Sequence, residues 1–233
     1  MAQSPIKNVC LLCEERGSEL PIFLGSCFAF SDRNCFLTAA HCIANRDVSK
    51  LIVQNPLTNG SVRVASVVIH PSADLAVIRL QSDGKTVVPV APFAGIMKIK
   101  GIGGEYYAYG YPEDSIGPNA GTPTARIFRG YGQRVFLHHS HMHYNYLALE
   151  LNFPCPGGLS GGPLFKPKTF QLVGLVTENI EATTSLHEEE ITFDNGKLVT
   201  NHYRRVINYG LGLLLHDYDN WLAEVLAPDL NGI

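Results

Sequence analysis

The sequence predicts an all-β protein whose antiparallel strands form barrels or sandwiches, with one helix near the C-terminus. About eleven short runs are rich in β-branched, aromatic and aliphatic residues. Turn-forming segments such as PLTNG, QSDG and DNGK separate these runs at close spacing. Such spacing is typical of barrels and sandwiches and not of alternating strands and helices. The late segment HDYDNWLAEVL instead repeats apolar residues at helical spacing before Pro228.

The expected strands follow one another along the chain, and no sequence repeat divides them. A polar segment over 181–205, containing HEEE and NHYRR, predicts an exposed insertion between the last two strands. The expected strands are 26–30, 35–41, 51–54, 62–70, 75–80, 87–91, 106–112, 125–130, 146–152, 171–176 and 210–216.

Composition and charge argue against nucleic-acid and membrane partners. The chain has 233 residues, 45% of them hydrophobic, and a formal net charge of −3, so no basic stripe for a polyanion is expected. Its longest apolar stretches fall short of the roughly 18 residues that a membrane-spanning helix requires. The first residues, MAQSPIKNVC, lack the apolar run of a secretory signal, so a cytoplasmic location is expected.

Three separate stretches carry residues that together can hydrolyse an acyl bond. FLTAAHC ends a strand at His41, PSADLAVIRL opens a strand at Asp74, and PGGLSGGPLF presents Ser160 in a tight turn. A serine hydroxyl is a weak nucleophile until a base takes its proton, and a carboxylate is needed to orient an imidazole base. The backbone N–H groups of Gly158 and Ser160 can converge on an oxyanion, because glycine reaches backbone conformations closed to other residues.

These stretches carry a family resemblance. LTAAHC, DLAVIRL and GLSGGPL resemble the signature blocks of chymotrypsin-like (trypsin-like) serine proteases. GSCFAF, YAYGYP, QLVGLVT and WLAEVL resemble further elements of bacterial HtrA/Deg-like peptidase domains, over about residues 18–227 and without a PDZ domain. The resemblance implies a single peptidase unit over 1–233 made of two antiparallel six-stranded β-barrels of the chymotrypsin type and a C-terminal α-helix. The implied bounds are about 18–98 and about 103–215 for the barrels and 216–227 for the helix.

The resemblance also implies a function and a mechanism. The implied activity is that of a serine endopeptidase acting through a triad of His41, Asp74 and Ser160 and a covalent acyl-enzyme, with Gly158 and Ser160 as oxyanion donors. No metal or organic cofactor is expected. The expected partners are a protein or peptide substrate, in a narrow processing or signalling role, and a regulatory protein. Two alternatives stay open, namely a catalytically inactive peptide-binding module and a serine hydrolase that acts on esters.

The resemblance implies a specificity pocket walled by NFPCP (152–156) and VTEN (176–179). The position that is acidic in trypsin is Pro154 here, so a preference for Arg or Lys does not follow from it. Glu178, expected near the pocket mouth, either favours a basic residue or is a solvated surface charge. The residues expected to bind substrate are Pro154, Cys155, Thr177, Glu178 and Asn179, with Thr177 and Asn179 offering backbone groups to an extended peptide.

The sequence departs from secreted zymogens at Leu159. Those proteins carry an Asp before the nucleophile, and this Asp pairs with a new N-terminus released by cleavage. The chain has neither that Asp nor an IVGG-type start, so activation by a new N-terminus is not expected. We expect a site that is already formed, or one that a partner or loop ordering switches on.

The cysteines and histidines leave further alternatives open. Cys10 and Cys13 form a C-x-x-C pair but lack a second pair that would complete a zinc site. Cys27 and Cys42 either form a disulfide or are free buried thiols. The segment LHHSHMHYNY, with His138, His139, His141 and His143, predicts a transition-metal site, a hairpin near the cleft, a pH-sensitive loop or a solvated loop.

Overall fold

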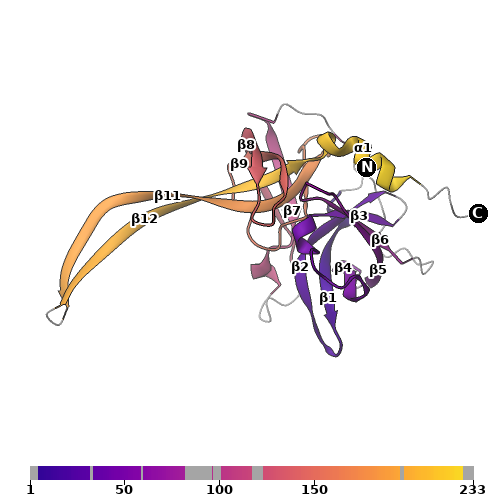
Figure 1. The fold of residues 1–233 in the computed structure, drawn as a ribbon, viewed down its shortest axis with the longest axis horizontal. Helices are drawn as coiled ribbons and strands as arrows, with labels where there is room; N and C mark the ends of the chain where they lie inside the picture. Colours follow the sequence, from indigo (N-terminus) through magenta and orange to yellow (C-terminus); the bar gives the residue numbers. More distant parts are fainter. Residues whose placement is uncertain are drawn as a thin grey trace, which may run out of the picture.

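Two closed β-barrels of six antiparallel strands each lie side by side in the computed structural model (Figure 1). The structure describes residues 5–31, 34–58, 60–81, 96, 101–116, 123–194 and 197–227. The predicted class, two antiparallel six-stranded barrels with a C-terminal helix, is confirmed. The strand expected at 87–91 lies outside the described residues.

The first barrel closes in the order β1-β2-β3-β6-β5-β4. Its strands are β1 (Val9–Arg16), β2 (Glu19–Ser31), β3 (Cys35–Thr38), β4 (Leu51–Asn55), β5 (Gly60–Ile69) and β6 (Ala76–Leu80). The sequence did not predict β1, so this barrel begins before the expected boundary near residue 18. The first five residues of β1, VCLLC, are all buried. Cysteine behaves here as a small apolar side chain and completes a continuous buried run.

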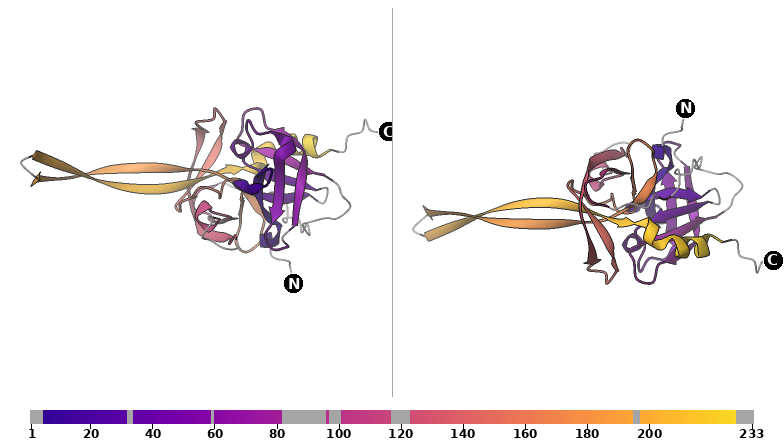
Figure 2. Two further views of the ribbon diagram at one scale, coloured as in Figure 1. Left: turned by 90° about the horizontal axis from the view of Figure 1, so that it is seen from below. Right: turned by 90° about the horizontal axis from the view of Figure 1, so that it is seen from above.

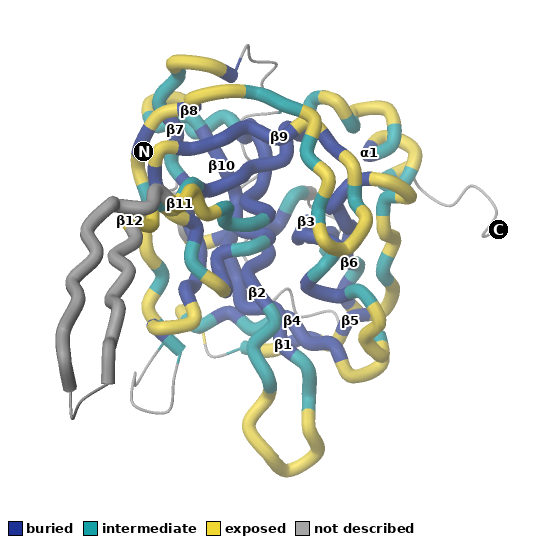
Figure 3. Tube along the Cα trace, turned by 60° about the vertical axis from the view of Figure 1, so that its left-hand side comes forward, coloured by how far each residue is buried: buried dark blue, intermediate teal, exposed yellow. Residues whose placement is uncertain are grey.

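The second barrel closes in the order β10-β11-β12-β9-β8-β7. Its strands are β7 (Glu105–Gly110), β8 (Arg126–His139), β9 (Asn145–Leu151), β10 (Pro163–Phe165), β11 (Leu172–Asp194) and β12 (Lys197–Leu214). Buried residues follow the strands of both barrels, and exposed residues gather at the turns (Figure 3). The cleft between such barrels is therefore built from strand ends and loops on a rigid scaffold.

Short helical turns connect the strands. They are η1 (Pro5–Asn8), η2 (Ala40–Cys42), η3 (Val48–Lys50), η4 (Glu113–Ser115) and η5 (Leu215–Tyr218), and η5 leads into the α-helix α1 (Asp219–Leu226). Within the described part of the chain, no helix is long and apolar enough to cross a membrane.

The last two strands run far beyond their barrel as a two-stranded ribbon (Figures 1 and 2). Pairing continues from Ile180 with Tyr209 to Asp194 with Lys197, interrupted by one register shift. The expectation of a separate insertion over 181–205 is therefore wrong, because β11 and β12 simply continue through it. The polar composition hid these strands, since a ribbon without a covering layer lacks the apolar alternation that marks a half-buried strand.

The C-terminal helix packs on the first barrel, although it follows the second barrel in sequence (Figure 1). The rings of Tyr218 and Trp221 make edge-on contacts with His70, at centroid distances of 4.9 and 5.0 Å. The Arg79 guanidinium of β6 donates a hydrogen bond to the carbonyl of Val225. The helix therefore holds the end of the chain against β5, β6 and the loop that joins them.

All six cysteines are buried and none is in a disulfide, so the alternative of a Cys27–Cys42 disulfide is wrong. Burial raises the pKa of Cys10 and of Cys13 to about 12, and it also raises the pKa of Cys27 and of Cys155. Because the thiolate is the reactive form, these thiols are poor nucleophiles in the folded chain.

We predict that iodoacetamide modifies the native protein slowly but alkylates all six thiols after unfolding in denaturant without reductant. Intact-mass spectrometry of both samples measures the number of adducts. The matched control is the unfolded sample treated with reductant first, which should give the same mass. Fewer than six adducts without reductant would reveal a disulfide and contradict the assignment.

Candidate active site

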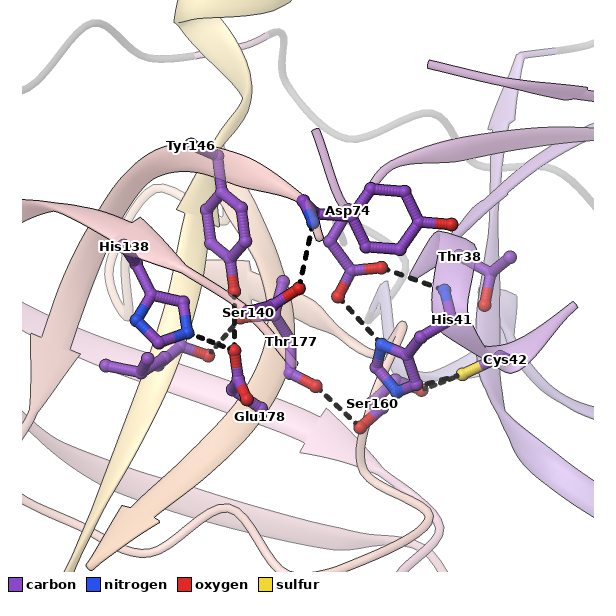
Figure 4. Close-up of polar contacts among 12 residues, drawn as sticks. Thr38, His41, Cys42, Asp74, His138, Ser140, Tyr146, Ser160, Thr177 and Glu178 are labelled. Carbon is purple, nitrogen blue, oxygen red and sulfur yellow. Dashed lines mark hydrogen bonds and ion pairs between the residues drawn. The ribbon is translucent and has the colours of Figure 1, made fainter. Parts of the chain in front are cut away.

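His41 and Asp74 form a doubly hydrogen-bonded pair at the junction of the barrels (Figure 4). His41 lies in the helical turn after β3, and Asp74 lies in the loop before β6. The backbone N–H of His41 donates to Oδ1 of Asp74 at 2.9 Å, and the ring Nδ1 lies 2.7 Å from Oδ2. An ionised carboxylate only accepts hydrogen bonds, so the proton sits on Nδ1 and leaves Nε2 free to act as a base.

The pKa of His41 follows from this environment. Burial lowers the pKa of the imidazole, but the hydrogen bond with Asp74, aided by Cys42, outweighs burial and raises the pKa above its ordinary value of 6.5. Asp74 itself is only 2% exposed. The electrostatic effect of its carboxylate on the ring is therefore weakly screened by solvent.

Ser160 lies beside the imidazole, but its hydroxyl points elsewhere in this structure (Figure 4). Ser160 Oγ donates a hydrogen bond to the carbonyl of Thr177 at 2.8 Å. The Nε2 atom of His41 instead faces Cys42 Sγ at 3.6 Å. The structure thus brings the three predicted residues together, but the serine hydroxyl is bonded to the Thr177 carbonyl of β11 and not to His41.

The turn around Ser160 needs glycine at two positions. Gly158 and Gly161 both adopt positive φ, at +85° and +82°. A Cβ at Gly161 would lie 2.1 Å from the carbonyl oxygen of Ser26, and one at Gly158 would lie 2.6 Å from that of Tyr111. The turn therefore packs directly against the neighbouring backbone, and no larger residue fits.

The peptide that joins Gly157 to Gly158 is oriented by a hydrogen bond. The N–H of Glu113 donates to the Gly157 carbonyl at 2.8 Å. In a trans peptide the C=O and N–H point in opposite directions, so the Gly158 N–H points away from Glu113. Among the described residues, neither Gly158 N–H nor Ser160 N–H has an acceptor. Both donors are thus available to an incoming oxyanion.

Ser26 of β2 ties this turn to the first barrel, a role that the sequence did not reveal. Its hydroxyl donates to the Gly158 carbonyl at 2.8 Å and accepts from the Tyr111 N–H at 3.0 Å. Its backbone N–H donates to the Ser160 carbonyl at 2.8 Å, and its own carbonyl accepts from the hydroxyl of Thr38. One fully buried serine therefore fixes the turn relative to β3, the strand that leads to His41.

His70 holds the loop that carries Asp74 and was also missed. Its Nδ1 accepts the backbone N–H groups of Ser72 and Ala73, at 3.2 and 2.9 Å. Burial lowers the pKa of His70, which favours the neutral ring that can accept these bonds. A histidine that ends a strand gives no sequence signal for this role, because the turn and the contacts with Trp221 arise only in the folded chain.

The predicted substrate-binding residues fall on two sides of β11. The side chain of Asn179 accepts a hydrogen bond from the Cys155 N–H at 3.1 Å, so Asn179 faces the segment that holds the exposed Pro154. Glu178 faces the other way and lines a cavity with His41 and Asp74, so it does not lie at the mouth of the expected pocket. A bulge at Thr177 sets this arrangement. Val176 pairs with Gly212 of β12 and Glu178 pairs with the adjacent Leu211, so Thr177 is the extra residue in β11.

The histidine-rich segment forms the end of the β8–β9 hairpin. β8 ends at His139 and β9 begins at Asn145, whose N–H donates to the carbonyl of Ser72. The hairpin thus contacts the loop that carries Asp74. Within the described residues, no three or more His, Cys, Asp or Glu side chains are grouped to hold a metal ion. The alternatives of a metal site in this segment and of a zinc site at Cys10 and Cys13 gain no support.

Two barrels with a histidine–carboxylate pair on one and a serine in a glycine turn on the other define a hydrolase of the chymotrypsin fold. A family model described as the trypsin-like peptidase domain matches residues 25–175, and the chain belongs to this family of serine endopeptidases. No curated protein matches the sequence.

Solved structures of bacterial proteases share this fold. The active form of the Rv3671c protease from M. tuberculosis has a TM-score of 0.64 and 16% identity, with 97% of this chain and 83% of that chain covered. The MamO protease domain from Magnetospirillum magneticum has a TM-score of 0.63 and 17% identity, with coverage of 98% and 100%. The HtrA-type protease AlgW with tripeptide has a TM-score of 0.61 and 16% identity, with coverage of 95% and 60%.

We predict that Ser26→Ala lowers both stability and activity. The change leaves the buried Gly158 carbonyl and Tyr111 N–H without partners, which costs about 1–3 kcal/mol of unfolding free energy. A small displacement of Ser160 should reduce kcat/KM by about tenfold to a hundredfold.

Thermal unfolding and peptide cleavage measure the two effects of Ser26→Ala. Ser115→Ala is the matched control, because Ser115 is also buried and donates to a carbonyl, that of Pro112, but does not contact the turn. Equal losses of kcat/KM in both variants would contradict a specific role for Ser26.

Proposed function

We propose that the chain cleaves peptide bonds through nucleophilic attack by Ser160, with His41 as base and Asp74 as its orienting carboxylate. The observation that carries the proposal is the doubly bonded His41–Asp74 pair beside a serine whose turn is anchored to the same barrel. The proton on Nδ1 fixes the tautomer in which Nε2 accepts. A binding module would not require this tautomer beside two backbone N–H groups, those of Gly158 and Ser160, that have no acceptor among the described residues.

Substrate binding supplies the step that frees the serine. β10 pairs with β11 only as far as Leu175, so the edge of β11 at Thr177–Asn179 is open to an extended peptide. An N–H of that peptide competes for the Thr177 carbonyl, which is the present acceptor of the Ser160 hydroxyl. The hydroxyl then rotates to Nε2 of His41, displacing the weak contact with Cys42.

The proposed reaction then proceeds through acylation of Ser160 and hydrolysis of the acyl-enzyme. Ser160 Oγ forms a bond to the substrate carbonyl carbon as its proton passes to Nε2, and the carbonyl electrons move to the oxygen. The N–H groups of Gly158 and Ser160 stabilise that oxyanion. The oxyanion collapses, the C–N bond breaks, and the imidazolium donates its proton to the leaving amine. Water hydrolyses the acyl-enzyme by the same route, and no step requires a metal or an organic cofactor.

Leu159 supports a turn that does not depend on a new N-terminus. Its side chain is fully buried in the core of the second barrel. Apolar burial of Leu159 and the bonds of Ser26 hold the turn, a role that an Asp–amine ion pair has in secreted enzymes after their zymogens are cleaved. We propose that the role is narrow processing or signalling, and a regulatory protein partner stays a prediction.

We predict that Ser160→Ala and His41→Ala each lower turnover of peptides by several orders of magnitude, because removing one triad member disables the others. Cleavage of a peptide library and labelling by a fluorophosphonate measure the effect, and wild type should be labelled at Ser160.

The pattern of losses separates the alternatives. An unlabelled wild type without cleavage would favour the inactive peptide-binding module. Turnover of esters with intact peptides would favour the ester hydrolase. Ser185→Ala, a serine of the distant β11–β12 ribbon, is the control and should retain wild-type activity.

We predict that activity falls as pH falls through the pKa of His41, because a protonated ring cannot take the serine proton. Since this pKa is raised, the acid limb of kcat/KM should lie above pH 6.5. Asp74→Asn removes the interaction that raises the pKa while burial still lowers it, so the pKa of His41 should shift downward. The maximal rate should also drop by orders of magnitude, because the preferred tautomer is lost.

The titration of the His41 ring by NMR in Ser160→Ala and in the Ser160→Ala/Asp74→Asn double variant measures the shift directly. An unchanged or higher pKa in the double variant would refute the assignment of Asp74 as the dominant partner.

A further inference from the structure

A cavity of about 220 Å³ lies beside His41, on the side away from Pro154 and Cys155. It is lined by His41, Asp74, Ser140, His141, Met142 and Glu178. Resting on the proposed function, we propose that this cavity is the subsite for the second residue before the scissile bond. Through Glu178 it selects lysine or arginine at that position.

The direction of the substrate strand places that side chain in the cavity. In the proposed binding mode, the residue whose carbonyl meets Ser160 donates its N–H to the Thr177 carbonyl, in place of the Ser160 hydroxyl, and directs its side chain toward the segment where the Cys155 N–H bonds Asn179. Successive side chains of an extended peptide point to opposite faces. The preceding residue therefore points toward His41. Glu178 precedes Asn179 in β11, points away from Cys155 toward His138 and Tyr146 (Figure 4), and lines the cavity beside His41.

The charges around the cavity favour a cation. Two carboxylates, Asp74 and Glu178, line it, and no lysine or arginine does so among the described residues. Asp74 is committed to His41, which leaves Glu178 as the carboxylate available to a ligand. His141 also lines the cavity.

Glu178 is held in place with acceptor capacity to spare. Its Oε1 accepts a hydrogen bond from Tyr146 OH at 3.2 Å and pairs with His138 Nε2. Its Oε2 has no donor among the described residues, so a cationic side chain can bind there. The side chain of Glu178 is 24% exposed, which allows access from the cleft while limiting its mobility.

The remaining wall suits a long alkyl chain. Met142, at the end of the β8–β9 hairpin, lines the cavity and is 47% exposed. Lysine and arginine pack their methylene groups on apolar surface and extend the charged end to a polar partner. A lysine at this position would cover Met142 and reach Glu178. A short or acidic side chain would do neither, and an acidic one would be repelled.

A peptide library randomised at every position tests the inference. Mass spectrometry of products made by wild type gives the frequency of each residue at the second position before the cut. We expect lysine and arginine to be enriched there by roughly tenfold, as a charge-assisted hydrogen bond supplies. Glu178→Gln, which keeps the shape and removes the charge, should abolish the enrichment. Glu181→Gln, the same change at an exposed position further along β11, should retain it.

A second readout does not depend on cleavage. Immobilised Ser160→Ala protein is loaded with the same library, and the retained peptides are sequenced, with and without Glu178→Gln. Retention of lysine- and arginine-containing peptides that is lost with Glu178→Gln supports the subsite.

The outcomes separate this inference from the proposed function. Cleavage without enrichment, or enrichment that survives Glu178→Gln, overturns the subsite and leaves the peptidase intact. Absence of both cleavage and fluorophosphonate labelling overturns the peptidase, and the retention experiment then decides the subsite alone. Equal retention of lysine- and arginine-containing peptides by the Ser160→Ala protein with and without Glu178→Gln overturns the subsite.

Discussion

The contact between Ser26 and the turn of Gly158–Gly161 is the constraint on which the site depends. The turn approaches β2 so closely that a Cβ at Gly161 would lie 2.1 Å from a backbone oxygen, so the backbones of the two barrels are in direct contact there. Such a contact leaves little freedom for adjustment, because a packed interior transmits strain. The carbonyl of Ser26 also accepts a bond from Thr38, three residues before His41. Ser160 and His41, which belong to different barrels, are therefore held in position relative to one another by one buried residue.

The buried carboxylate of Asp74 is the second feature that organises the site. Asp74 is nearly inaccessible to solvent, and an ionised carboxylate in such a place requires strong partners. Both of its oxygens find them in His41, through the backbone N–H and through the ring. The loop that presents Asp74 is organised by His70, which in turn packs on Trp221 of the C-terminal helix. The helix that ends the second barrel thus supports the carboxylate of the first.

The sequence predicted what depends on local pattern, and it missed what depends on the meeting of distant segments. Strand periodicity and turn residues predicted an all-β protein of barrels or sandwiches, and the family resemblance implied two barrels. The order of histidine, aspartate and serine, with glycines around the serine, predicted the candidate site. The same reasoning missed β1, because its two cysteines were weighed as thiols and not as apolar residues. It misplaced Glu178, because a bulge at Thr177 is invisible in the sequence yet decides which way the next side chains point. A serine within a strand gives no sign of the four hydrogen bonds that Ser26 makes.

The bulge at Thr177 lies in the stretch of β11 that holds the Ser160 hydroxyl in this structure and that is proposed to bind the substrate and select its side chain. Because the extra residue interrupts the pairing with β12, the Thr177 carbonyl is left to the cleft, where it accepts the Ser160 hydroxyl. In the proposed mechanism a bound peptide needs that same acceptor, so a substrate that pairs with β11 would also release the Ser160 hydroxyl. By the same proposal, a peptide that cannot pair would leave the Ser160 hydroxyl bonded to the Thr177 carbonyl and away from His41. The turn, held by Leu159 and Ser26, need not rearrange for this to occur. The proposed mechanism therefore places control of activity at the open edge of β11, and Glu178, the residue proposed to select the neighbouring substrate side chain, directly follows the same bulge.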